Sequence, residues 1–362
     1  MRYPEFLPQN GTIGFVAPSF GCAIEPYYSG FEYARKTWQS MGYQMDMGPN
    51  CLLAEGIGIS NTPKKCGEEL TEYYCKKGNH VLISCGGGEL MCETLDFVDF
   101  EAIKAAKPKW YMGYSDNTNM TFLLTTMCDT ASVYGPCASE FRMNPWHKAL
   151  EESFGVLNGS IATEVTDVSG GKIWSITVNN YDRWEKESLK DEEHPFVPYH
   201  LTEPFQMKAY SGTQEVDLNQ EITFEGRLLG GCMDCLVNLL GTNFDHVAEF
   251  VEKYKEDGFV WFIESCDLNV MSIRRAMWQM EHAGWFKYVK GFLIGRPLCG
   301  SEQKMLGLDT YAAVTEVVAK YNVPVLMDLD IGHTPPKMPL ISGSYAKVRA
   351  QNNEIAIEML LK

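Results

Sequence analysis

Ser115 has the surroundings of a nucleophile. It follows the apolar run Trp110 to Tyr114, which predicts a strand, and it precedes an apolar stretch that predicts a helix as far as Met127. A serine in a sharp turn between strand and helix exposes its hydroxyl beside backbone N–H groups, which suits attack on a carbonyl carbon. Serine and aspartate are also common helix caps. The sequence around Ser115 and Asp116, taken alone, therefore favours a simple cap.

The glycine run Gly86 to Gly88 could hold the negative oxygen that forms in such an attack. It follows the apolar run Val81 to Cys85, so unhindered backbone amides would lie at the end of a strand. An ordinary tight turn explains the same glycines. A nucleotide-binding loop is a weaker alternative, because GGGELM lacks the GxGxxG spacing.

His333 is the histidine whose position best suits a general base. Imidazole is the usual base for a serine because its pKa lies near neutrality. Of the seven histidines, His333 follows the predicted strand Val323 to Met327 in a loop shaped by Gly332 and by Thr334 to Pro336. A loop histidine by itself is more often a solvated surface residue, so a third group is needed to support the assignment.

Glu264 could orient that base. It ends the apolar run Phe259 to Ile263, which predicts a buried strand. A carboxylate there could hold the imidazole and stabilise its charged form, or it could be a surface residue or helix cap. Ser115, Glu264 and His333 each follow a predicted strand, in the chain order that α/β-hydrolases use. Their shared placement favours a serine hydrolase.

The elements that position these residues predict an α/β fold. Strand, turn and helix alternate in a way that indicates a mainly parallel sheet, which binds ligands at the carboxyl ends of its strands. The 362 residues exceed what one hydrophobic core usually organises. We expect an N-terminal nucleophile domain over residues 1–155 and a C-terminal domain over 211–362 that carries Glu264 and His333. Residues 156–210 show little periodicity and predict a linker and substrate loop.

Composition and charge restrict the partners. The formal charge of −16 and the pI near 4.9 argue against binding to nucleic acid or anionic membranes, since both require clustered Lys and Arg. The first residues lack the basic and apolar regions of a signal peptide, and no apolar run reaches membrane-spanning length. We therefore expect a cytoplasmic protein.

The cysteines predict neither disulfides nor a metal site. Twelve cysteines are scattered along the chain, which is typical of buried thiols in a cytosolic protein. Cys232 and Cys235 form a lone CxxC at an expected helix start after Gly230 and Gly231, without the second ligand pair of a zinc motif. Core packing explains them best, and we expect no metal and no cofactor.

Six stretches, in order along almost the whole chain, resemble the LD-carboxypeptidase family of serine peptidases, which includes the microcin C self-immunity peptidases. The stretches are GFVAPS (Gly14 to Ser19), ISCGGGE (Ile83 to Glu89) with the following LDFVDF, PKWYMGYSDNT (Pro108 to Thr118), GRLLGGCMDCLVNLLGT (Gly226 to Thr242), FIES (262–265) with the following IRRAMWQM, and DIGHTPP (Asp330 to Pro336).

The resemblance implies a site and a fold. The family's nucleophile falls on Ser115, its carboxylate on Glu264 and its base on His333. Its oxyanion donors fall on the amide of Gly87 or Gly88 and on that of Asp116. It also implies a flavodoxin-like N-terminal domain, a second α/β domain, an active site between them and a homodimer. With the resemblance added, the catalytic role of Ser115 outweighs the cap.

The resemblance further implies hydrolysis of an amide bond next to a free carboxylate. The favoured substrate is the L,D bond of a cytosolic murein peptide, as in peptidoglycan recycling, and the alternative is an aminoacyl-nucleotide conjugate. A non-catalytic peptide- or nucleotide-binding protein is the alternative from another class. Arg274 or Arg275 could bind the substrate carboxylate. Trp184 is a candidate pocket residue in the 156–210 segment.

Overall fold

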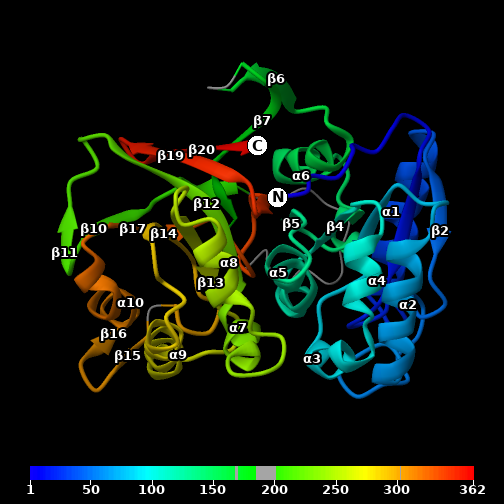
Figure 1. The fold of residues 1–362 in the computed structure, drawn as a ribbon, viewed down its shortest axis with the longest axis horizontal. Helices are drawn as coiled ribbons and strands as arrows, with labels where there is room; N and C mark the ends of the chain where they lie inside the picture. The colour runs from blue at the N-terminus through cyan, green and yellow to red at the C-terminus, as the bar shows by residue number, and fades with distance from the viewer. Residues whose placement is uncertain (168–169, 185–200, 302) are drawn as a thin grey trace. The chain divides into compact units, whose positions relative to one another are not determined.

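The computed structural model describes residues 1–167, 170–184, 201–301 and 303–362 (Figure 1). The chain forms two compact units. The N-terminal unit contains Met1–Ala162, and the C-terminal unit contains Thr163–Arg183 and Leu201–Lys362. No helix in these described ranges is long and apolar enough to cross a membrane.

The N-terminal unit is built on a parallel sheet with the strand order β2-β1-β3-β4-β5. This is the flavodoxin-like order, so the expected fold of this unit is confirmed. The strands are β1 (Thr12–Val16), β2 (Gln44–Met47), β3 (Val81–Ser84), β4 (Trp110–Gly113) and β5 (Ser132–Tyr134). β3 and β4 are buried along their whole length, as their continuous apolar sequence requires.

Helices connect or follow these strands. They are α1 (Tyr27–Ser40), α2 (Pro63–Cys75), α3 (Met91–Thr94), α4 (Phe100–Ala105), α5 (Thr118–Thr126) and α6 (Lys148–Asn158), with 3₁₀ turns η1 (Leu95–Phe97), η2 (Ser115–Asn117) and η3 (Ala138–Arg142). Of these helices, α1, α2 and α5 contact the strands. Trp38 of α1 is fully buried, with its ring centroid 5.6 Å from that of Phe15 and 5.0 Å from that of Phe141. These aromatic contacts fix α1 on the sheet.

The C-terminal unit is built on a mixed sheet with the order β11-β10-β17-β14-β13-β12-β19-β20-β7-β6. Its parallel centre is β12 (Ile222–Cys232), β13 (Phe259–Glu264), β14 (Val289–Gly295) and β17 (Pro324–Leu329). The flanking strands are β6 (Ala162–Thr166), β7 (Lys172–Asn179), β10 (Lys208–Ser211), β11 (Gln214–Val216), β19 (Tyr345–Gln351) and β20 (Glu354–Leu361). The unit is α/β, as expected, with antiparallel strands added on both sides of the parallel centre.

The remaining elements of the C-terminal unit are short strands and helices. The helices are α7 (Met233–Leu239), α8 (Val247–Lys253), α9 (Val270–His282) and α10 (Thr310–Val318), with the 3₁₀ turn η5 (Ala319–Tyr321). The short strands are β9 (Leu201–Glu203), β15 (Lys304–Met305), β16 (Leu308–Asp309) and β18 (Leu340–Ser342). The two-residue strand β8 (Arg183–Trp184) ends directly before residues 185–200.

The segment predicted as a linker and substrate loop contributes strands to the C-terminal sheet. β7 pairs antiparallel with β20, and its residues Ile176 and Val178 are fully buried. Their alternation with polar residues is that of a half-buried strand, and the polar surroundings obscured it. Residues 185–200 and the side chain of Trp184 lie outside the described part of the structure.

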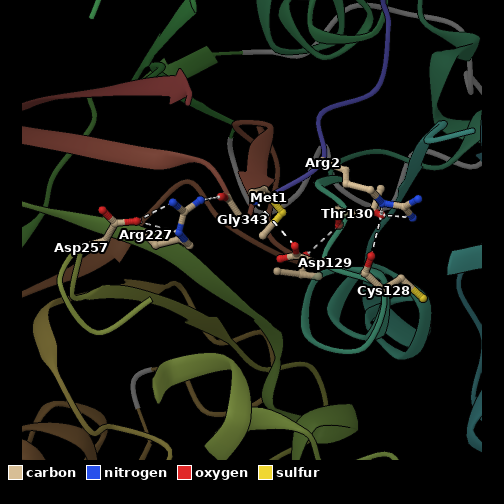
Figure 2. A network of polar contacts seen from close by, with 9 residues as sticks. Met1, Arg2, Cys128, Asp129, Thr130, Arg227, Asp257 and Gly343 are labelled. Carbon is tan, nitrogen blue, oxygen red and sulfur yellow. Dashed lines mark hydrogen bonds and ion pairs between the residues drawn. The ribbon is translucent and has the colours of Figure 1, made fainter. Parts of the chain in front are cut away.

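One arginine in each unit makes hydrogen bonds that join separate segments of the chain (Figure 2). In the N-terminal unit, Arg2 donates from Nε to Thr130 Oγ1 at 3.0 Å, which fixes the chain start beside the segment before β5. In the C-terminal unit, Arg227 of β12 donates from Nε to Asp257 at 3.0 Å and also donates to the carbonyl of Gly343. Arg227 is 3% exposed, and a buried guanidinium requires such partners.

Glu69 of α2 is a buried carboxylate that braces the turn after β1. It is 3% exposed, and its two oxygens accept hydrogen bonds from the backbone amides of Ala17 and Asn50, both at 2.9 Å. Burial raises the pKa of Glu69 to about 7, and the two amides only partly offset this. The folded protein therefore binds a proton at Glu69 more tightly than the unfolded chain does.

This raised pKa makes stability depend on pH. Because the folded pKa exceeds the unfolded value, Glu69 stabilises the fold at acidic pH, and this stabilisation is lost as the pH rises toward 7. We expect the unfolding free energy of wild type to fall by about 2 to 3 kcal/mol more than that of Glu69→Gln between pH 5 and pH 8. Urea unfolding of both proteins at the two pH values measures the difference. An equal change in unfolding free energy in the two proteins would contradict a raised pKa at Glu69.

Candidate active site

Ser115 lies in a strained turn at the end of β4. Its φ is 62°, in the left-handed region that costs an L-residue about 1–3 kcal/mol. The N-caps of η2 and of the following helix α5 are Tyr114 and Asn117, and neither cap makes a side-chain hydrogen bond. Ser115 and Asp116 therefore occupy neither cap position, and the structure does not support the cap alternative. Strained, half-exposed serines after a parallel strand are typical of nucleophile elbows.

Gly87 lies directly against the Ser115 side chain. A Cβ added to Gly87 would be 3.2 Å from Ser115 Cβ and 3.3 Å from Ser115 Oγ. The carbonyl of Gly87 accepts a hydrogen bond from the Phe20 amide at 2.7 Å, and Gly88 lies beside Ser19. The N-terminal unit thus brings together the predicted nucleophile and the predicted oxyanion glycines.

Asp116 ties the Ser115 turn to its neighbours. Its carboxylate is 3% exposed and accepts from Ser19 Oγ at 2.5 Å, from the Met91 amide at 2.9 Å and from Asn119 Nδ2 at 3.1 Å. Burial raises the pKa of Asp116 to about 6, against the opposing effect of the hydrogen bonds from Ser19 and Met91. The side chain of Asp116 therefore has a positioning role, which leaves its backbone amide as the part predicted to contact substrate.

Glu264 and His333 form a hydrogen-bonded pair in the C-terminal unit. Glu264 ends β13 and is 1% exposed, and its Oε2 lies 2.8 Å from Nδ1 of His333, in the loop after β17. Gly332 has a φ of 98°, and a Cβ on it would lie 2.3 Å from Glu264 Oε2. Only glycine permits this close approach of the loop to the carboxylate.

The electrostatics of this pair suit a general base. Burial alone would lower the pKa of His333, but the charge of Glu264 and the hydrogen bond to it raise the pKa above its usual value. A carboxylate that holds Nδ1 fixes the imidazole and leaves Nε2 to exchange a proton with a reactant.

Arg296 holds the loop that carries His333, a role that sequence reasoning missed. Its Nη2 donates to Asp330 Oδ1 at 3.1 Å and to the carbonyls of Thr334 and Pro335, both at 3.2 Å. Asp330 is fully buried. The available signals were the arginine directly after the strand β14 and the aspartate in DIGHTPP, but neither indicates that the two meet.

The predicted substrate-binding arginines have other contacts. Arg274 of α9 donates to the Ala312 carbonyl and pairs with Glu316, both at 2.8 Å, and Arg275 donates to Ser272 Oγ at 2.9 Å. None of these contacts involves Glu264 or His333. A substrate role for either arginine stays a prediction, as does that of Trp184.

Each of the two units matches the model of a known protein domain. The family model described as LD-carboxypeptidase N-terminal domain matches residues 13–135, and the LD-carboxypeptidase C-terminal domain matches residues 225–348. The microcin C7 self-immunity protein MccF of Escherichia coli is 25% identical over 97% of this chain and 94% of its own length. A probable murein peptide carboxypeptidase of Bacillus subtilis is 21% identical over 98% of this chain and 94% of its length.

The fold is also that of solved structures. MccF in complex with aspartyl sulfamoyl adenosine superposes with a TM-score of 0.73 at 22% identity, over 98% of this chain and 97% of that one. At 22% identity the structural similarity establishes the fold alone. Membership of the family rests on the two family models. Since they match in order over most of the chain, the protein belongs to the LD-carboxypeptidase family of peptidases.

Proposed function

We propose that the protein is a serine hydrolase that cuts an amide bond next to a free carboxylate, with Ser115 as its nucleophile. The observation that carries the proposal is the strained Ser115 held against the backbone of Gly87, in a chain of a peptidase family. The hydrogen-bonded Glu264 and His333 supply the orienting carboxylate and the base.

The proposed reaction uses an acyl-enzyme. His333 accepts the proton of the Ser115 hydroxyl while Oγ attacks the amide carbonyl, and Glu264 stabilises the resulting imidazolium. The amides of Gly87 or Gly88 and of Asp116 stabilise the oxyanion. His333 then protonates the leaving amine, and a water molecule, deprotonated by His333, hydrolyses the ester to regenerate Ser115.

For the substrate, we propose the L,D amide bond of a murein peptide in the cytoplasm. The similarity to a probable murein peptide carboxypeptidase over nearly the whole chain supports this class. The alternative is an aminoacyl-nucleotide conjugate. It is supported by the 25% identity to MccF, a protein whose structure contains aspartyl sulfamoyl adenosine.

Competing substrates test the proposal. We expect a murein tetrapeptide with a C-terminal D-residue to be cleaved with a higher kcat/KM than an aminoacyl sulfamoyl adenosine. Two matched peptides serve as controls, one with an L-residue at the C-terminus and one with a C-terminal amide. The amide should lose about 10- to 100-fold, since a hydrogen bond to a charged group contributes about 1.5–3 kcal/mol. Faster cleavage of the adenosine conjugate would establish the alternative, and binding without cleavage of either substrate would reject a hydrolase.

A further inference from the structure

A cysteine thiol lies beside the Glu264 and His333 pair. Cys232 is the last residue of β12, and the strand register places it opposite Glu264 at the end of β13. One ligand atom from each of Cys232, Glu264 and His333 lies within 4.8 Å of the other two. Cys232 and Glu264 are both 1% exposed, and the His333 side chain is 10% exposed. The proposed hydrolysis has no use for the thiol.

These three side chains have the chemistry of a zinc site. Zinc prefers thiolate, imidazole and carboxylate ligands, with bonds of about 2.0 to 2.3 Å, so its ligand atoms lie about 3.3 to 3.7 Å apart. Ligand atoms at the 4.8 Å limit would have to approach by no more than about 1.5 Å, whereas Glu264 Oε2 and His333 Nδ1, which lie 2.8 Å apart, would have to separate by at least about 0.5 Å if both bind the ion. A thiolate and a carboxylate together balance the charge of Zn²⁺, and hard ions such as Mg²⁺ bind thiolates poorly.

We propose that Cys232, Glu264 and His333 bind a zinc ion as three protein ligands, with a water molecule in the fourth position. Binding converts the Cys232 thiol to a thiolate and releases its proton to solvent, while His333 binds as the neutral imidazole.

The CxxC motif is not the basis of this site. Cys235 lies in α7, and its thiol hydrogen-bonds to Cys232, which could suggest a two-thiol site. Among the described residues, the cluster of possible metal ligands instead consists of Cys232, Glu264 and His333. These two ligands come from β13 and from the loop after β17, far from the cysteine in sequence.

Zinc at this position would inhibit hydrolysis, an inference that rests on the proposed function. A bound divalent cation withdraws the negative charge of Glu264 and disfavours the imidazolium that must form when Ser115 is deprotonated. The ion therefore competes with the catalytic use of His333.

Metal titration tests the site without any assay of activity. Protein stripped of metal and kept reduced is titrated with Co²⁺, followed by its thiolate charge-transfer and tetrahedral visible bands, and with Zn²⁺ by calorimetry. We expect one ion per chain, with the affinity reduced about 100-fold or more in Cys232→Ala and in His333→Gln, since even outer-shell changes cost 10- to 100-fold. Thermal unfolding shows whether each variant is folded. If Cys232→Ala does not fold, the affinity of His333→Gln alone tests the site.

Matched variants separate this site from its rivals. Cys235→Ala and the exposed-cysteine variant Cys299→Ala should keep the wild-type affinity. Loss of binding in Cys235→Ala, with binding retained in His333→Gln, would overturn the proposed ligand set. Ser115→Ala should bind zinc with the wild-type affinity but should not hydrolyse substrate. The experiment can therefore reject the zinc site and the hydrolase activity separately. Stoichiometric zinc that leaves hydrolysis unchanged would overturn the inhibition.

Discussion

Ser115→Ala is expected to lower kcat by about 10⁴- to 10⁶-fold, because removal of the nucleophile from a serine triad leaves only the contribution of binding and the oxyanion donors. Alanine also has a Cβ, so the strained φ of 62° and the contact with Gly87 persist. Substrate binding should therefore change little. Turnover and substrate affinity measured on the same preparation distinguish lost chemistry from lost binding.

A second variant at this position tests the strain itself. Ser115→Gly should be equally inactive but more stable than Ser115→Ala by about 1 kcal/mol, because glycine adopts a positive φ without the cost of a Cβ. Ser40→Ala, at an exposed helix end, is the matched control and should keep wild-type turnover. Residual hydrolysis near the wild-type rate in Ser115→Ala would reject the serine mechanism.

Glu264→Gln is expected to lower kcat by about 10⁴-fold, the effect of removing the carboxylate charge from a serine triad. Glutamine preserves the shape of the side chain but cannot stabilise the imidazolium of His333 or hold its tautomer as a carboxylate does. The loss should appear mainly in kcat, since Glu264 is buried behind the imidazole and its hydrogen bond is to His333.

The same substitution on the surface provides the control. Glu252→Gln removes a carboxylate that pairs with Lys255 and Lys287 but lies in an exposed cluster, so turnover should stay at the wild-type level. Thermal unfolding of Glu264→Gln shows whether the fold is kept. A folded Glu264→Gln protein with nearly full kcat would show that His333 does not depend on this carboxylate.

The flavodoxin-like unit could be predicted because its strands are distinctive in sequence. β3 and β4 are short, continuous apolar runs, and such runs bury both faces in a parallel sheet. The residues after them are polar or glycine, which located the candidate site at the strand ends. Local pattern left catalysis and capping open at Ser115, and the chain-wide resemblance then favoured catalysis.

The C-terminal unit shows where local pattern was insufficient. The sequence predicted a helix start after Gly230 and Gly231, and α7 does begin at Met233. The two glycines themselves lie within β12, where a Cβ on Gly230 would be 1.7 Å from the Phe262 carbonyl oxygen. These glycines serve the close approach of two backbones, which depends on a neighbouring strand. The strand β7 was missed for a related reason, because its pairing with β20 joins residues far apart in the chain.

The sequence by itself determined the classes of residue at each strand end and the α/β fold that presents them, since apolar periodicity and glycine placement are local properties. Only the tertiary structure decided that Glu264 meets His333 at 2.8 Å, that Arg296 holds the following loop and that Cys232 lies beside both members of the pair. These contacts depend on strand register and loop path between residues remote in sequence, where no local pattern specifies which side chains will meet.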